Sequence, residues 1–192
     1  MKFEYPEGAT PLEYEESIEL IPTHITMHSE LNEWEASNIS EAVSWLENTK
    51  SHTLSEVFIK KLHHKMFNHT WKWAGKFRKT NKNIGVEWYE ISQYLFNLLE
   101  DTKTQIQNAS YSTEEIAIRF HHRLVQIHCF PNGNGRHARC ASNKLAKELQ
   151  IPDFTWGSIN LTNPSEIRGK YIKALQCADK HSYDALIQFA RS

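Results

Sequence analysis

The sequence predicts a single, almost entirely α-helical domain with one small β-hairpin. Apolar residues recur at helical spacing through most of the chain after about Ser29. β-Favouring residues grouped around Asn and Gly occur in only one stretch, 78–89. Because the pattern does not alternate strands with helices, a parallel sheet of the Rossmann or P-loop type is not expected.

The N-terminal residues differ from the rest in composition. Residues 1–28 are expected to form an extended arm, since prolines and a glycine are scattered among many glutamates. One short helix is expected in this arm, near 13–20. Residues 29–192 are expected to form one domain, because 192 residues is a single-domain length.

Apolar periodicity and capping residues mark the helices of this domain. The Thr53-Leu54-Ser55-Glu56 sequence has capping-box spacing, and Ser112 precedes two glutamates. The Asn163-Pro164-Ser165-Glu166 sequence offers an N-cap followed by a proline at the first helical position. The apolar stripes lie at 36–47, 54–66, 91–106, 116–127, 138–149, 167–178 and 183–190.

The remaining regular element is expected at residues 78–89, RKTNKNIGVEWY. Its Asn and Gly residues separate two short β-favouring runs, which predicts a hairpin.

Charge and composition narrow the class of protein. A net charge of −1 argues against a general nucleic-acid binder, which needs clustered basic residues. Three cysteines without a CxxC pair are typical of reduced thiols in a cytosol. The acidic N-terminus lacks the apolar run of a signal peptide, and no stretch is apolar enough to span a membrane. A cytoplasmic protein is therefore expected, with no direct nucleic-acid or membrane partner.

The chemistry is expected in the loop from Asn132 to Arg136, which holds two of the seven glycines. Glycine permits positive φ angles, so that backbone amides can converge on one anion. The amides and the positive end of the following helix would form a phosphate cradle. Arg136 and Arg139 are three residues apart on one helix face and match a polyphosphate.

His128 stands just before this cradle. An accessible imidazole is mostly neutral at pH 7 and can accept a proton from a hydroxyl. A base, a phosphate cradle and two arginines together indicate phosphoryl or nucleotidyl transfer to a hydroxyl. The alternative interpretation is a plain turn between helices with solvated arginines.

The stretch from His128 to Arg139 resembles the signature of the Fic family. The matching residues are His128, Phe130, Gly133, Asn134, Gly135, Arg136 and Arg139. The segment 73–78, WAGKFR, resembles the lead into the Fic flap hairpin, and the resemblance covers about residues 50–180. The LIPTHIT, SELNEWE and FARS segments also resemble the mobile mystery protein B subgroup.

The resemblance implies an all-α Fic fold and a protein adenylyltransferase that uses ATP with Mg2+. His128 would deprotonate a Ser, Thr or Tyr hydroxyl of a target protein, and that oxygen would attack the α-phosphorus of ATP. Asn134 with the Gly133 and Gly135 amides would hold the α-phosphate, and Arg136 and Arg139 would engage the β- and γ-phosphates. The target segment would bind along the flap, by strand addition. The flap residues are Lys82, Asn83, Ile84, Gly85 and Val86.

Two residues depart from the family pattern. Cys129 replaces a proline, and is interpreted as a buried, inert thiol rather than a nucleophile. Asn132 replaces the Asp or Glu that holds Mg2+; an amide oxygen is a neutral ligand and would bind the metal more weakly.

Many Fic proteins carry an inhibitory glutamate that pairs with the second motif arginine, here Arg139. No segment fits the inhibitory motif fully, and the candidates are Glu19, Glu30 and Glu33. Inhibition by a partner is the alternative, either an antitoxin-like protein or the helix-turn-helix companion that the subgroup implies.

Three other functions stay open. The chain could be a degenerate Fic domain that binds a nucleotide and regulates a partner, or it could transfer UMP, phosphate or phosphocholine. A zinc enzyme is the third alternative, because histidines cluster in sequence, but no HExxH or CxxC spacing accompanies them. The clustered histidines are His121, His122, His128 and His137.

Overall fold

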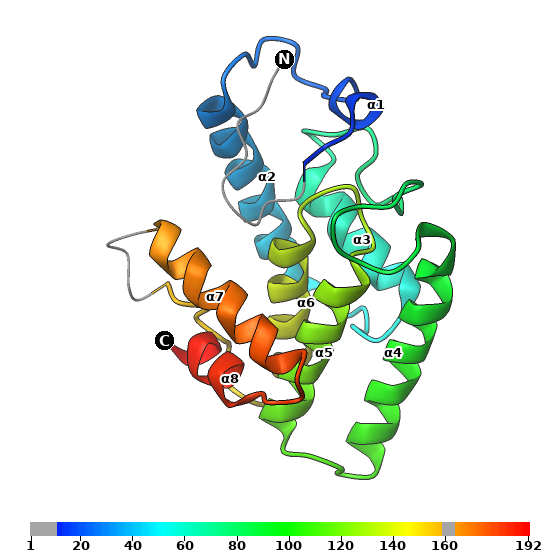
Figure 1. The fold of residues 1–192 in the computed structure, drawn as a ribbon, viewed down its shortest axis with the longest axis vertical. Helices are drawn as coiled ribbons and strands as arrows, with labels where there is room; N and C mark the ends of the chain where they lie inside the picture. The colour runs from blue at the N-terminus through cyan, green and yellow to red at the C-terminus, as the bar shows by residue number, and fades with distance from the viewer. Residues whose placement is uncertain (1–10, 159–163) are drawn as a thin grey trace.

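The computed structural model describes residues 11–158 and 164–192, and these residues confirm the predicted helical class (Figure 1). Expectations that concern residues 1–10 and the N-cap at Asn163 lie outside the described residues. The helices are α1 (Tyr14–Ser17), α2 (His28–Asn48), α3 (Glu56–Phe67), the 3-10 turn η1 (Trp88–Glu90), α4 (Ile91–Gln107), α5 (Thr113–Ile127), α6 (Asn134–Glu148), α7 (Pro164–Ala178) and α8 (Asp184–Arg191).

Helices α5 and α6 pack against each other in the centre of the domain. Figure 1 shows α4 on one flank of this pair and α7 with α8 on the other. The helix pair α2–α3 completes the bundle, because α3 contacts α6. Fully buried side chains such as Phe58, Leu62, Leu95 and Phe120 fill the space between the helices. Each contributes about 1.5–3 kcal/mol of hydrophobic free energy.

Side-chain caps explain where two helices begin. The Ser112 side chain accepts the amide of Glu115 at 3.1 Å, as its position predicted. The predicted cap at Thr53 is wrong: α3 is capped by Ser55, whose hydroxyl accepts the Phe58 amide at 3.2 Å. Thr53 instead donates its backbone N–H and its hydroxyl to Glu148 on α6, at 3.1 and 3.0 Å. The long-range carboxylate therefore outcompetes the local cap.

Of the expected arm, the structure describes residues 11–28. The short helix predicted near 13–20 is a single turn, α1, and α2 begins eight residues before the expected Ala36. Glu30 fixes that start, because its carboxylate accepts the amides of Thr26 and Met27 at 2.9 and 3.0 Å.

The predicted β-hairpin at 78–89 is wrong: among the described residues of this stretch there is no strand, and the chain forms an irregular flap, residues 79–87, before η1. The physical reason is Arg78, whose guanidinium donates to the carbonyls of Thr80 and Val86. These carbonyls are therefore satisfied by a side chain rather than by a partner strand. An isolated two-stranded hairpin is marginally stable in any case.

No helix within the described ranges has the length and apolarity needed to cross a membrane.

Candidate active site

The loop between α5 and α6 places His128 in an unusual backbone conformation. His128 is the C-cap of α5 and has φ 56° and ψ 60°, in the left-handed region that non-glycine residues rarely adopt. Its carbonyl accepts the Arg78 Nε–H at 2.6 Å. A strained conformation that is held by a buried guanidinium is a feature of functional positions.

The imidazole of His128 is neutral, but the prediction that it is accessible is wrong, because the ring is buried. The residue is 5% exposed, and burial followed by the charges of Arg78 and Lys82 lowers its pKa to about 4. Among the described residues, neither ring nitrogen has a hydrogen-bond partner of normal geometry. A weaker contact with the Val125 backbone raises the pKa slightly but does not offset the effect of burial. At pH 7 this ring is a base whose nitrogens are not engaged by the protein.

His128 lines a cavity that has a volume of about 910 Å³. The volume is in the range of small-molecule and cofactor sites. The motif loop, the flap, α2 and α7 all contribute to its wall. The lining residues used below are Leu12, Glu35, Trp71, Asn83, Ile84, Gly85, His128, Asn132, Gly133, Asn134, Gly135, Arg136, Arg139, Arg168 and Tyr171.

The N-terminus of α6 points its positive end at this cavity. Gly133 is the N-cap with φ 77°, and a Cβ there would lie 2.4 Å from the Phe67 ring. The Gly133 amide donates to the Asn132 side-chain oxygen at 2.6 Å. Only glycine fits at position 133, because any side chain would collide with Phe67. The loop can therefore pack on Phe67 while the N-terminus of α6 stays exposed to an anion in the cavity.

Asn134 braces the loop from within. Its Oδ1 accepts the Phe130 amide at 2.9 Å, and its Nδ2 donates to the Phe130 carbonyl at 2.8 Å. The Phe130 ring is buried and stacks on His63 with the ring centroids 3.7 Å apart. Both side-chain polar atoms of Asn134 are thus engaged by Phe130, while the resemblance implied a contact with the α-phosphate.

His63 of α3 supports the same loop. The residue is fully buried, and its Nδ1 accepts the Gly75 amide at 3.0 Å. Its Nε2 is therefore the protonated nitrogen and donates to the Asn132 carbonyl at 3.1 Å. This bond ties the loop to α3.

The two motif arginines have different partners. Arg136 makes an ion pair with Glu35 of α2, with 2.6 Å between Nη1 and Oε2. Arg139 has no carboxylate within 4.0 Å in the described part of the chain, and its guanidinium lies over the Tyr171 ring at 5.5 Å. Arg139 is therefore free of acidic neighbours and Arg136 is not.

Arg168 of α7 is a third guanidinium at this cavity, and sequence reasoning missed it. Burial, then the charges of Arg139 and Arg136, lower the pKa of Arg168. Three cations that share one cavity repel one another, so an anion of high charge would relieve the repulsion. The only signal for Arg168 in the sequence is its position one helical turn before Tyr171.

Glu35 was also missed, and the predicted inhibitory glutamates lie elsewhere. The Glu30 carboxylate caps α2, and the two capping amides lower its pKa. Glu30 and Glu33 line a separate, smaller pocket, and the Glu19 carbonyl accepts the Lys72 amide at 3.1 Å. Among the described residues Glu35 is the carboxylate that the structure brings to a motif arginine. Its other oxygen accepts the Trp71 indole N–H at 2.8 Å.

The flap packs directly on the motif loop. The Val86 amide donates to the Ile127 carbonyl at 3.4 Å, and the Arg78 amide donates to the Cys129 carbonyl at 3.0 Å. Gly85 has φ 108°, and a Cβ there would lie 2.8 Å from the Cβ of His128. Asn83, Ile84 and Gly85 face the cavity, while the Lys82 side chain is 2% exposed and pairs with Glu16.

Cys129 is 1% exposed, and burial raises the pKa of its thiol to about 12. Its interpretation as a buried thiol is confirmed.

The clustered histidines do not form a metal site. His121 bonds the Tyr171 hydroxyl at 2.9 Å, His122 bonds Asp179 at 2.8 Å, and His137 bonds the Ile59 carbonyl at 2.9 Å. Within the described ranges no three His, Cys, Asp or Glu side chains gather as metal ligands do. The arrangement does not support the zinc alternative.

Magnesium has a weak protein ligand set here. The Asn132 side-chain oxygen is uncharged and already accepts the Gly133 amide. The residues therefore fit a Mg2+ ion only as an adjunct to phosphate oxygens, which would carry most of its coordination.

The model of the Fic/DOC family matches residues 53–146. The N-terminal FIC domain of Bep8 from Bartonella sp. 1-1C has a TM-score of 0.70 at 16% identity, with 89% of each chain covered. BepC from Bartonella tribocorum with bound AMPPNP has a TM-score of 0.67 at 17% identity, covering 93% of this chain and 97% of that one. Fic-1 (residues 134–508) from C. elegans has a TM-score of 0.69 at 22% identity, covering 92% of this chain and 52% of the other.

Comparison with curated proteins gave no match. The similarity to the Fic/DOC family model is thus limited to residues 53–146, and the chain has the fold of the solved Fic structures. Two Bartonella structures with this fold have a bound nucleotide, AMPPNP in one and ADP in the other.

Proposed function

We propose that this chain is a protein adenylyltransferase that moves AMP from ATP to a Ser, Thr or Tyr hydroxyl of a target protein. The observation that carries the proposal is the shared cavity: a neutral, unengaged His128 ring faces the same space as the N-terminus of α6 and three arginines. The reaction needs a base that accepts the hydroxyl proton and a site that binds the polyphosphate.

In the proposed reaction His128 accepts the hydroxyl proton as the oxygen bonds to the α-phosphorus. The bond from that phosphorus to the bridging oxygen breaks, and pyrophosphate leaves with the electron pair. Arg139 and Arg168 balance the charge of the leaving group, together with Arg136 once it is released from Glu35. A magnesium ion on the phosphate oxygens would supply further charge neutralisation.

The test is intact-mass analysis of the chain and of a candidate target after incubation with ATP and Mg2+. Wild type is expected to add the mass of an AMP group, and His128→Ala is expected to add none. His52→Ala, which alters an exposed histidine, is the matched control and should behave as wild type. Separate ATP samples labelled on the α- and γ-phosphates distinguish AMP transfer from phosphate transfer. Addition by His128→Ala at the wild-type rate would refute the proposal.

The second candidate is a nucleotide-binding regulatory module, and the Glu35–Arg136 ion pair is the observation that favours it. Because Arg136 is paired with Glu35 and Asn132 carries no charge, fewer charged groups are left to stabilise a reacting phosphate or to bind a metal. Under this alternative ATP binds but no mass is added, even with Glu35→Gln.

The finer assignments belong to the same proposal. The N-terminal sequence supports membership in the mobile mystery protein B subgroup, and that membership would bring a helix-turn-helix companion or an antitoxin-like inhibitor. The reduced-thiol cysteine pattern supports a cytoplasmic location.

A further inference from the structure

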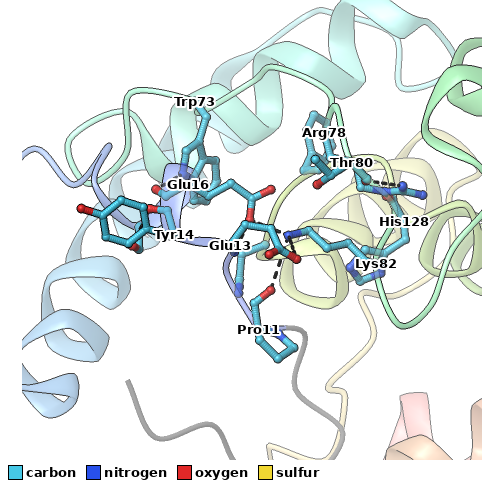
Figure 2. Close-up of polar contacts among 12 residues, drawn as sticks. Pro11, Glu13, Tyr14, Glu16, Trp73, Arg78, Thr80, Lys82 and His128 are labelled. Atoms are coloured by element: carbon cyan, nitrogen blue, oxygen red, sulfur yellow. Dashed lines mark hydrogen bonds and ion pairs between the residues drawn. The ribbon is translucent and has the colours of Figure 1, made fainter. Parts of the chain in front are cut away.

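Lys82 of the flap is a buried charge that the proposed transfer reaction does not use. Its side chain is 2% exposed. Its ammonium lies 2.5 Å from Glu16 Oε2, 3.7 Å from Glu13 Oε1 and 3.5 Å from the Pro11 carbonyl oxygen. Figure 2 shows the ammonium directed at these three residues, all of which belong to one short N-terminal segment.

We call residues 11–17, which include α1, the N-terminal strap. The strap is held at its far side by the Trp73 indole, which donates to the Glu16 carbonyl at 3.1 Å. Residues 19–21 are fixed separately, because the Ile21 amide donates to the Thr70 carbonyl at 2.9 Å and the Lys72 amide donates to the Glu19 carbonyl. The strap can therefore leave its place while the chain after it stays attached.

The strap contributes one residue to the wall of the candidate active site. Leu12 lines the same cavity as His128, Ile84 and Gly85. The Lys82 charge also contributes to the lowered pKa of His128, so the ammonium is within electrostatic range of the imidazole. A group that pairs with Lys82 is thus held against the flap, next to the cavity that His128 lines.

From this placement we infer that the acceptor segment of the target is acidic and that the N-terminal strap occupies its place as a stand-in; the inference rests on the proposed transfer function. Lys82 binds a carboxylate near the acceptor hydroxyl, and Glu16 supplies that carboxylate when no target is bound. A buried ammonium needs an anionic partner, so a target without one would leave Lys82 desolvated and unpaired.

The strap presents a carboxylate to Lys82 without presenting a hydroxyl to His128. The Tyr14 side chain is 74% exposed, and in Figure 2 it points away from His128. The Ser17 hydroxyl donates to the Tyr14 carbonyl of its own turn at 2.7 Å. A target segment that replaced the strap could satisfy Lys82 and also deliver an acceptor oxygen.

The test uses the full chain and two synthetic peptides with a single serine, one flanked by glutamates and one by glutamines at the same positions. Binding is measured by fluorescence anisotropy with a non-hydrolysable ATP analogue present. Glu13→Gln/Glu16→Gln should bind the acidic peptide about tenfold or more tightly than wild type does, because the competing carboxylates are gone. Glu15→Gln, which alters a neighbouring exposed glutamate, is the matched control and should bind as wild type.

Wild type itself should prefer the acidic peptide over the glutamine peptide, and Lys82→Gln should lose that preference. This comparison does not depend on the folding of the double variant. Equal binding of the two peptides by wild type and by Glu13→Gln/Glu16→Gln would overturn the inference.

Binding separates this inference from the transferase proposal. A preference for the acidic peptide without any AMP transfer would refute the transferase and leave the binding site standing. Transfer to both peptides at equal rates would leave the transferase standing and refute the acidic acceptor.

Discussion

Replacing Glu35 with glutamine should release Arg136 from its ion pair and make its guanidinium available to the nucleotide. The ion pair joins a carboxylate that is 7% exposed to a guanidinium that is 34% exposed, at 2.6 Å. Glutamine removes the negative charge and retains an oxygen that can accept the Trp71 indole N–H. The substitution therefore removes the negative charge at position 35 and keeps the size of the side chain and its hydrogen bond to Trp71.

The expected gain follows from the type of bond that Arg136 would form. A hydrogen bond to a charged group contributes about 1.5–3 kcal/mol net, and about 1.4 kcal/mol is a tenfold change in affinity. ATP should therefore bind Glu35→Gln roughly ten to a hundred times more tightly than wild type. The free energy of unfolding should fall by only about 1–2 kcal/mol.

Isothermal titration calorimetry with ATP measures the affinity, and a urea melt measures the stability. Glu33→Gln, an exposed glutamate two residues away on α2, is the matched control. Glu35→Ala should lose about 1–3 kcal/mol more than Glu35→Gln, because it leaves the buried indole N–H without an acceptor. Weaker ATP binding by Glu35→Gln would show that Glu35 orients Arg136 for the phosphates rather than withholding it.

Three further outcomes are expected. Asn132→Asp should reach half-maximal AMP transfer at a lower Mg2+ concentration than wild type, because a carboxylate adds charge at the metal; equal magnesium curves would remove the idea. Gly133→Ala should lower the free energy of unfolding by about 1–3 kcal/mol in a urea melt, whereas Gly135→Ala, whose Cβ would meet nothing nearer than 3.7 Å, should lose less than about 1 kcal/mol; equal losses would contradict the steric argument. Burial lowers the pKa of His121 to about 3 and that of His137 to about 4, so their stabilisation is complete above pH 6.5 and is lost as the pH falls toward 4. Each contributes up to about 1.4 kcal/mol per pH unit, and identical urea midpoints at pH 7 and pH 5 would be inconsistent with buried neutral rings.

The position of the motif loop was predictable because its determinants are local. His128, the loop glycines and the two arginines lie within twelve consecutive residues, and α5 and α6 flank them as their apolar stripes predicted. Helix periodicity and glycine chemistry act over a few residues, so one sequence is enough to read them.

The partners of the loop were not predictable by the same reasoning. Glu35 and Arg136 are 101 positions apart, and Arg78 and His128 are 50 apart. Nothing in local composition links such pairs. The hairpin prediction failed for the same reason, since propensity at 78–89 was overridden by one guanidinium that bonds main-chain carbonyls.

The Arg78 side chain holds the flap and the motif loop together through backbone groups. Its guanidinium donates to carbonyl oxygens of the flap, at Thr80 and Val86, and of the motif loop, at Ile127 and His128. All four acceptors are peptide groups, whose chemistry does not change when a side chain is exchanged. Flap side chains other than that of Gly85 can therefore change while the backbone geometry around His128 is kept.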